Sequence, residues 1–173
     1  FENNKYYNSL INITSKKVTF FDKKILVPFG EFLPLRDSLN FLESIVGPNN
    51  YSKGKTERKI NISKKISFIP VICYEIVFYW KLLNRFNYKS HFIINITNDF
   101  WFGDYLGPYQ HFYLTKIRAA EFNKPIIRVS NNGISAVIDN NGKILNNTEL
   151  NKIGTFKHKL LIRENNNFVN FHL

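Results

Sequence analysis

The sequence predicts an α/β fold whose sheet is antiparallel in part. Two runs are apolar almost throughout, 66–73 (ISFIPVIC) and 91–96 (HFIINI), as expected of strands that are buried on both faces. Segments suited to helices follow them, at 74–86 and, after a loop, at 110–123. Buried strands that alternate with helices are typical of a parallel sheet covered by helices. The strands predicted after the second helix have no helix between them, which favours antiparallel pairing there.

The chain before the first apolar run combines strand and loop signals. The β-branched and aromatic stretches 18–21 and 25–27 predict two strands around a polar step. Pro28, Gly30 and Pro34 then predict a loop. Next, 35–46 has apolar residues at helical spacing and predicts a short amphipathic helix. The polar segment 47–59, with Gly-Pro and Asn-Asn pairs, predicts a mobile excursion.

The second half of the chain carries the clearest helix. Glycine and aromatic residues at 98–108 predict a loop, and 110–123 has apolar side chains at helical spacing. Strands are predicted at 125–129 and 134–138. Asn141-Gly142 is the preferred dipeptide of a type I′ turn, so we expect a hairpin between the last of these strands and the residues behind it.

Length and composition exclude several classes of protein. The 173 residues amount to one domain or a large piece of one, and 44% apolar content is enough for a sizeable core. A single cysteine excludes a disulfide framework and a four-thiolate metal site, and the four histidines show no ligand spacing. No run approaches the roughly 20 apolar residues that cross a bilayer. Because the chain lacks methionine and starts at Phe1, we expect a fragment or a processed product.

The formal net charge of +11 leaves two interpretations open. A basic surface attracts nucleic acid, anionic lipid or acidic substrates. Abundant lysine, asparagine, isoleucine, phenylalanine and tyrosine are also typical of an AT-rich genome. The charge is dispersed, and no block of like charge reaches five or six residues, which favours genome bias over a nucleic-acid-binding module.

Cys73 is the candidate nucleophile. It stands where an apolar strand ends and a predicted helix begins, a place where free N–H groups stabilise a thiolate. A lone cysteine after Val-Ile can equally be core, although Glu75 is an unusual neighbour for an inert thiol. Lys23, Lys24 and Glu31 are either solvated residues or partners of this thiol, since strand order could bring them together.

Six motifs occur in an order and at distances that are specific when taken together. They are ILVPFGEFLP (25–34), VICYE (71–75), NDFWFG (98–103), GPYQH (107–111), RAAE (118–121) and RVSNNGISAVID (128–139). Over roughly 6–155 the chain resembles the nitrilase-type domain of the bacterial apolipoprotein N-acyltransferase family. The resemblance implies an αββα sandwich. It also implies that 1–173 is a partial nitrilase-like domain that lacks its N-terminal strands, with the family's transmembrane bundle outside the sequence.

The resemblance also implies roles for individual residues. Cys73 matches the nucleophile, and Lys23, eight residues before Glu31, matches the lysine of the family's Glu–Lys–Cys triad; Lys24 does not. Glu31 matches a supporting glutamate, and Tyr74 and Glu75 match residues that hydrogen-bond around the site. The triad glutamate has no counterpart, because the family places it in an upstream Pro-Glu pair that this sequence lacks.

The implied reaction transfers an acyl chain from a phospholipid, through a cysteine thioester, to the N-terminal amine of a diacylglyceryl-cysteine lipoprotein. It implies an enzyme of the bacterial inner membrane with this domain on the periplasmic side, without cofactor, metal or nucleic acid. The alternative is a soluble nitrilase-family amidohydrolase, in which water discharges the thioester. Two smaller expectations concern the aromatic loop: Trp101 and Phe102 either face lipid or lie in the core, and His111 orients the helix after Pro108.

Overall fold

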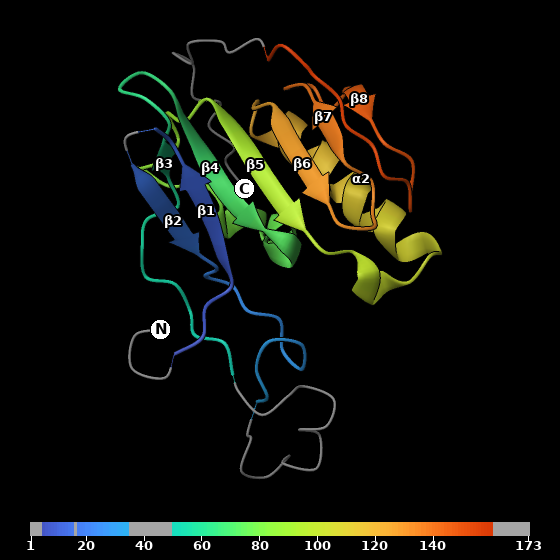
Figure 1. Cartoon of the computed structure of the whole chain (residues 1–173), viewed down its shortest axis with the longest axis horizontal. Helices are drawn as coiled ribbons and strands as arrows, with labels where there is room; N and C mark the ends of the chain where they lie inside the picture. The colour runs from blue at the N-terminus through green and yellow to red at the C-terminus, as the bar shows by residue number, and fades with distance from the viewer. Residues whose placement is uncertain (1–4, 16, 35–49, 161–173) are drawn as a thin grey trace.

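The computed structural model describes residues 5–15, 17–34 and 50–160, so the helix expected at 35–46 lies outside the described residues. The strands are β1 (Ser9–Ile13), β2 (Val18–Asp22), β3 (Ile60–Asn61), β4 (Ser67–Ile72), β5 (Phe92–Thr97), β6 (Ile126–Ser130), β7 (Ala136–Ile138) and β8 (Ile144–Asn147). The helix α2 covers Leu106–Glu121, and the 3₁₀ turns are η2 (Cys73–Val77), η3 (Tyr79–Lys81) and η4 (Phe100–Phe102). Figure 1 shows their arrangement.

Six strands form one mixed sheet in the order β3-β4-β5-β6-β7-β8. The central strands β4, β5 and β6 run parallel, whereas β3, β7 and β8 join antiparallel to their neighbours. This confirms the α/β class and the antiparallel edge expected from the strand order. It also places the ends of β4, β5 and β6, and the loops that follow them, at one edge of the sheet.

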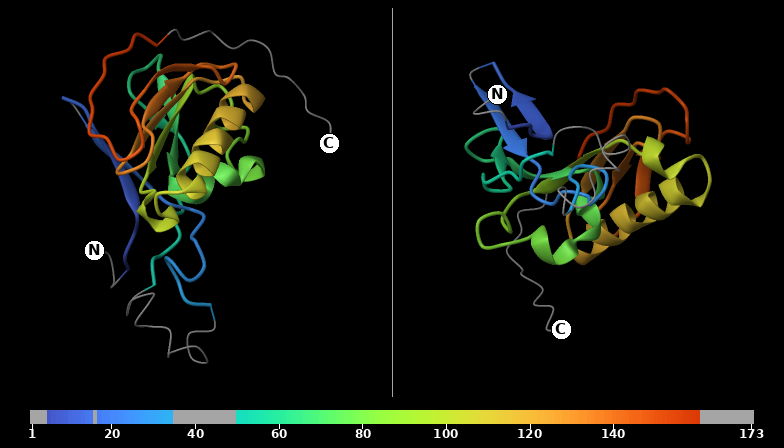
Figure 2. Two further views of the ribbon diagram at one scale, coloured as in Figure 1. Left: turned by 90° about the vertical axis from the view of Figure 1, so that its right-hand side faces the viewer. Right: turned by 90° about the horizontal axis from the view of Figure 1, so that it is seen from below.

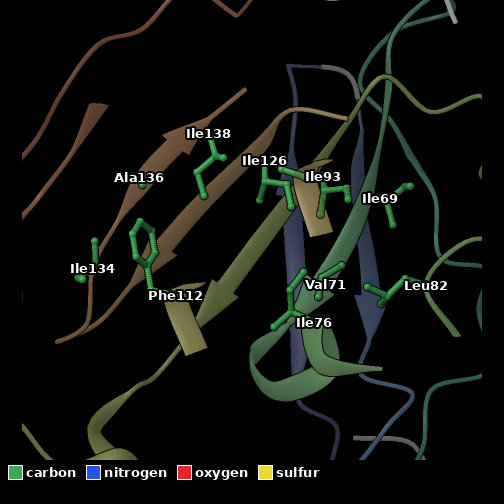
Figure 3. Close-up of a cluster of buried hydrophobic side chains, with 11 residues drawn as sticks. Ile69, Val71, Ile76, Leu82, Ile93, Phe112, Ile126, Ile134, Ala136 and Ile138 are labelled. Atoms are coloured by element: carbon green, nitrogen blue, oxygen red, sulfur yellow. The ribbon is translucent and has the colours of Figure 1, made fainter. Parts of the chain in front are cut away.

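The sheet is covered differently on its two faces. Figure 2 shows α2 on one face and the antiparallel hairpin β1–β2 on the other. Because side chains alternate along a strand, β4 sends Ile69 and Val71 toward α2, and Phe68 and Ile72 toward the hairpin. The core on the α2 face draws mainly on isoleucines of four strands, which Figure 3 shows in one layer. All six residues of β4 are buried, as its apolar sequence predicts.

The helix predicted at 74–86 is wrong. The chain forms the short 3₁₀ turns η2 and η3 there instead. Five consecutive residues, Ile76 to Trp80, are β-branched or aromatic, and such side chains lose rotamer freedom in an α-helix. In addition, the Glu75 carboxylate accepts a hydrogen bond from the Ile72 N–H at 2.9 Å, which folds the chain back on the end of β4.

Three further expectations need correction. Residues 25–27 form no strand, because the N–H of Ile25 bonds to a carboxylate rather than to a neighbouring strand. The 139–143 hairpin is present, but Gly142 has φ 81° and Asn141 is not in the left-handed region, so the turn is not type I′. The helix α2 starts at Leu106, before the predicted residue 110, because Pro108 is tolerated in a first turn whose N–H groups have no helical partner.

The polar segment expected to be a mobile excursion is anchored at its end. Arg58 is 2% exposed and lies inside the molecule, and Gly54 packs tightly against the Asp22 backbone. Gly54 therefore serves close packing and Arg58 a buried ion pair, whereas Lys53, Lys55 and Glu57 are exposed as expected of a polar loop.

Candidate active site

Polar side chains gather at the edge of the sheet where the three parallel strands end. Cys73 directly follows β4, Asn98 and Asp99 follow β5, and Ser130 closes β6. Open α/β sheets bind ligands at the carboxyl ends of their parallel strands. This edge is therefore the candidate site, and of the sequence-predicted residues Cys73, Tyr74 and Glu75 lie directly at it, in the turn that follows β4.

Cys73 occupies a strained turn. Its φ is 53°, in the left-handed region that side chains other than glycine rarely adopt. The side chain is half-buried, and Sγ lies 4.0 Å from the Asn98 carbonyl oxygen at the end of the adjacent strand. The sharp turn between a buried strand and a 3₁₀ helix leaves the thiol partly exposed, while it still packs against the core cluster on the hairpin face. The turn also leaves the next N–H groups without regular strand partners.

Glu75 ties this turn to the segment that follows Lys23. Its Oε1 accepts from the backbone N–H groups of Lys24 and Ile25 at 2.9 and 3.0 Å. Arg58 donates to both carboxylate oxygens at 2.7 and 2.8 Å. Burial alone raises the pKa of Glu75, but Arg58 and the backbone N–H groups of Ile72 and Ile25 lower it below its usual value. Glu75 is therefore an ionised, fully buried organiser of the turn.

The same ion pair bonds to the half of β4 that β3 does not pair with. The strand β3 pairs only with Ser67 and Phe68, so within the described part of the chain no strand pairs with the rest of β4 on that side. There the Arg58 Nη1 donates to the Pro70 carbonyl at 2.9 Å, and Glu75 accepts from the Ile72 N–H. Pro70 has no N–H to leave unpaired. Two side chains thus replace a missing strand directly before Cys73.

Lys23 and Glu31 form a second ion pair, in which Lys23 is buried and Glu31 is partly buried. Lys23 is 1% exposed, and its Nζ donates to Glu31 Oε2 at 2.7 Å. The same Glu31 carboxylate accepts from the Val27 N–H and the Asn8 amide. Lys24, in contrast, is half-buried, and its backbone N–H rather than its ammonium contacts Glu75. The two lysines are therefore not equivalent, and Glu31 holds Lys23 in place.

Tyr74 connects the turn to the aromatic loop. Its ring lies 6.3 Å from Phe102 and 6.0 Å from His111, measured between ring centroids. Phe102 also packs on His111 at 5.2 Å, whereas Trp101 is 74% exposed. The loop thus splits the two aromatic residues: Phe102 packs inward beside the turn, and Trp101 faces out.

A buried charged network lies beneath the site on the α2 face. Asp99 accepts from Arg128 Nη2 at 2.6 Å, from Ser130 Oγ at 3.0 Å and from His111 Nδ1 at 2.8 Å. Burial alone raises the pKa of Asp99, but His111 and Arg128 lower it to about 2. Gly133 is required here, because a Cβ would collide with the Asp99 carboxylate. The network joins β5, β6 and α2 behind the Cys73 turn.

Sequence reasoning missed three of these residues. Arg58 sits in a polar segment without periodicity, and Asp99 and Arg128 lie within recognised motifs but received no role. The usable signals were an arginine inside the otherwise apolar run 126–129 and an aspartate two residues after a buried strand. Charged residues in such positions are rarely buried unless they are paired. Among the described residues, no cluster of three metal-ligating side chains occurs.

The chain matches the family model described as carbon-nitrogen hydrolase over residues 1–162. Relatives that are about 40% identical to this chain are apolipoprotein N-acyltransferases. The protein from Allorhizobium ampelinum is 40% identical over 155 residues, which are 87% of this chain and 29% of the relative. The protein from Rickettsia typhi is 41% identical over 137 residues, 79% of this chain and 27% of the relative. The chain therefore spans less than a third of the length of these relatives.

Solved structures show the same fold at low identity. A carbon-nitrogen hydrolase superfamily protein from Xanthomonas campestris, with an arsenic adduct in its active site, superposes with a TM-score of 0.61 at 20% identity, covering 88% of this chain and 57% of that one. A nitrilase-superfamily protein of Saccharomyces cerevisiae gives 0.62 at 21%, covering 88% and 52%. The fold is thus the nitrilase-superfamily α/β fold with a mixed sheet. In the part of the chain that the structure describes, no helix is long and apolar enough to span a membrane.

Proposed function

Because this chain belongs to the carbon-nitrogen hydrolase family, we propose that it is the partial catalytic domain of an apolipoprotein N-acyltransferase. The observation that carries the proposal is the arrangement around Cys73, a strained cysteine tied through Glu75 to the backbone of Lys24 and Ile25, directly after the Lys23 that pairs with Glu31. The roughly 40% identity to apolipoprotein N-acyltransferases supports this choice within the family.

In the proposed first step, the Cys73 thiolate attacks the ester carbonyl of a phospholipid. A glutamate that is not among the residues named here takes the proton of the Cys73 thiol and gives it to the departing alkoxide oxygen, which leaves as the hydroxyl of the lysophospholipid. The Lys23 ammonium and the Tyr74 N–H stabilise the oxyanion of the tetrahedral intermediate. Glu31 holds Lys23, and Glu75 holds the turn, so both act by positioning. The product is an acyl thioester on Cys73.

In the second step, the N-terminal amine of a diacylglyceryl-cysteine lipoprotein attacks the thioester. The amine loses a proton to the same glutamate, an amide forms, and the thiolate leaves. Donor and acceptor both reside in a bilayer, so we place the complete protein in the bacterial inner membrane with this domain on the periplasmic side. The upstream strands, the glutamate and a membrane bundle would then belong to a longer gene product. The residues assigned here call for neither metal nor cofactor.

The test is acyl-enzyme formation by the complete gene product with phospholipid labelled in its acyl chain. We expect label on Cys73, none in Cys73→Ala, and a strongly reduced rate in Cys73→Ser. Adding a diacylglyceryl-cysteine peptide should discharge the thioester into an amide. Label that persists in Cys73→Ala contradicts the assignment of the nucleophile.

The same experiment separates the alternative function. A nitrilase-family amidohydrolase would discharge the thioester to water and would ignore the peptide amine. Discharge by water alone would therefore favour the hydrolase, with the nucleophile and its supporting residues unchanged.

A further inference from the structure

Arg118 ties the helix α2 to the turn that carries Cys73. The arginine is 7% exposed, and its Nε donates to the Ile76 carbonyl at 3.1 Å. Ile76 belongs to η2, the turn that begins at Cys73. Both views of Figure 2 show this turn beside α2. A charged side chain is rarely buried unless it has partners, and here one of the partners is the backbone of the nucleophile's own turn.

The rest of the guanidinium binds next to the same turn. Its Cζ lies 5.0 Å from the centroid of the Tyr79 ring in η3, a distance that suits a cation–π contact. Its Nη1 pairs with Glu121, three residues further along α2. Between η2 and η3 the chain leaves the helical conformation, because Phe78 has φ −89° and ψ 64°. Arg118 therefore spans a break in the chain and holds both turns against one face of α2.

The contact at Ile76 acts on Cys73 through a short, hydrogen-bonded turn. In a 3₁₀ helix three residues make one turn, and each carbonyl accepts from the N–H three positions on. Ile76 therefore lies one turn beyond Cys73. Glu75 fixes the turn to the end of β4 through the Ile72 N–H, and Arg118 fixes its far side to α2. The φ of 53° at Cys73 persists only where its surroundings hold it, and these two contacts hold it from two sides.

We propose that Arg118 is a positioning residue for the acylation step: through Nε it holds the Ile76 carbonyl, and it thereby keeps the Tyr74 N–H aimed at the oxyanion that forms beside Cys73. The proposal rests on the proposed thioester chemistry. An oxyanion donor is effective only when it already points at the place where the charge develops. Because Arg118 is buried on the α2 side of the turn, loss of its contact slows acylation and leaves the half-saturating donor concentration unchanged.

Three variants separate the Nε donor from the charge of the side chain. In Arg118→Gln the amide nitrogen stands at the Nε position, so a donor to the Ile76 carbonyl is kept and the charge is lost. In Arg118→Lys the charge is kept, and a methylene group stands at that position. Arg118→Met matches the length of glutamine and has neither the donor nor the charge. We expect acylation to slow by about 10-fold or more in Arg118→Lys and Arg118→Met, and Arg118→Gln to keep most of the rate.

The rates are measured on the complete gene product with labelled phospholipid and, in parallel, with p-nitrophenyl butyrate, whose burst reports acylation by any ester. Alkylation of Cys73 by iodoacetamide should change little in all three variants, because that reaction forms no oxyanion. A role confined to stability would instead favour Arg118→Lys, which keeps a cation for Glu121 and for the Tyr79 ring. Thermal unfolding of each variant shows whether the domain is folded at the assay temperature.

Normal acylation in Arg118→Met, or a rate in Arg118→Lys that equals or exceeds the rate in Arg118→Gln, would overturn the proposal. Equal losses of acylation and alkylation would overturn it too, because the thiol rather than the oxyanion donor would then be affected. If Arg118→Met unfolds at the assay temperature, the ranking of the other two variants decides. A wild-type burst without acylation by phospholipid would reject the proposed acyltransferase, while the ranking still decides the role of Arg118. Absence of any wild-type burst would overturn both.

Discussion

Cys73 shows how one residue depends on its neighbours for a conformation it would not adopt alone. Its φ of 53° is costly for a side chain with a Cβ. The Glu75 carboxylate holds the backbone on one side through Ile72, and His111 packs on the other side through Tyr74. Both supports are buried and charged or polar, so each of them tolerates few substitutions. At the residue scale, the site therefore consists of Cys73 together with the side chains that hold its backbone in place.

The two adjacent lysines give a test of residue assignment. Lys23→Ala should lower the acylation rate by about 10²–10³, the usual cost of losing an oxyanion donor. Lys24→Ala should change it little, because the contact of Lys24 with Glu75 uses the backbone. Lys23→Arg should also fail, since a planar fork does not replace a compact ammonium in a 1%-exposed site. The reverse ranking of Lys23→Ala and Lys24→Ala in the labelled-phospholipid assay would shift the assignment by one residue.

The Asp99 carboxylate predicts how stability depends on pH. Its pKa is lowered from 3.8 to about 2, so the folded state favours the ionised form more than the unfolded state does. The resulting stabilisation, about 2 kcal/mol, is fully present above the unfolded pKa and is lost as pH falls from about 4 toward 2. Asp99→Asn should therefore be less stable than wild type at pH 6, and the gap should narrow at pH 3.

Thermal unfolding of the complete protein at these two pH values measures the gap. Glu75, whose pKa is also lowered, keeps its own share of the acid sensitivity in both proteins. A gap that stays constant between pH 6 and pH 3 would mean that Asp99 is not a charged partner of Arg128.

At the scale of elements, side chains bond to the backbone of β4 where the neighbouring strand ends. The strand β4 is long and apolar, but its neighbour β3 pairs with only two of its residues. The Arg58–Glu75 pair satisfies the polar groups beyond that point and joins β4, η2 and the segment after Lys23. A two-residue strand and an ion pair therefore satisfy the hydrogen-bonding groups that one longer strand would satisfy. They fix the position of Cys73 at the end of β4.

Removal of Arg58 should destabilise the domain strongly. Arg58→Met leaves the fully buried Glu75 carboxylate without a cation, a change that costs roughly 3–5 kcal/mol. Arg85→Met is the matched control, because Arg85 is exposed and contacts only the Phe86 ring among the interactions described for it, so its effect should stay within roughly 0.5 kcal/mol. Adding Glu75→Gln to Arg58→Met should recover part of the loss. Equal melting temperatures for the two single variants would show that the pair is not buried in the working protein.

At the scale of the whole molecule, one face of the hairpin β1–β2 is open. Ile11, Ile13, Val18 and Phe20 lie on that face and are 59–75% exposed, whereas Leu10 and Phe21 pack inward on the sheet. Contiguous exposed apolar side chains of this kind mark a surface that needs cover. The face fits the proposal that the chain is a partial domain, in which further strands and helices complete the sandwich.

Residues 1–173 made alone should therefore be poorly soluble and catalytically incompetent. The open apolar face promotes aggregation, and the proposed base glutamate is not among these residues. Acyl-enzyme formation by the purified chain is compared with that of the complete gene product. Restoring upstream strands should recover solubility, and restoring a membrane bundle should recover transfer to lipoprotein. If the chain alone acylates as fast as the whole protein, Glu31 or Glu75 must act as the base, and their supporting roles are wrong.

The sequence by itself determined the α/β class, the two buried parallel strands, the main helix and the position of Cys73 at a strand end. These features depend on local patterns, because apolar periodicity and turn residues act over a few positions. The motif resemblance also pointed to Lys23 and Glu31, which the structure places in one ion pair. Their assignment as site residues stays a prediction.

Only the tertiary structure decided how the site is held together. Arg58 meets Glu75 across 17 positions, and Arg128 meets Asp99 across 29, so neither pair has a local signature. The replacement of the predicted 74–86 helix by 3₁₀ turns has the same origin, since Glu75 bonds to a strand end and to the distant backbone of Lys24 and Ile25. A buried charge is stable only beside its partner. Which residues become partners is a property of the folded sheet, and no window of the sequence contains it.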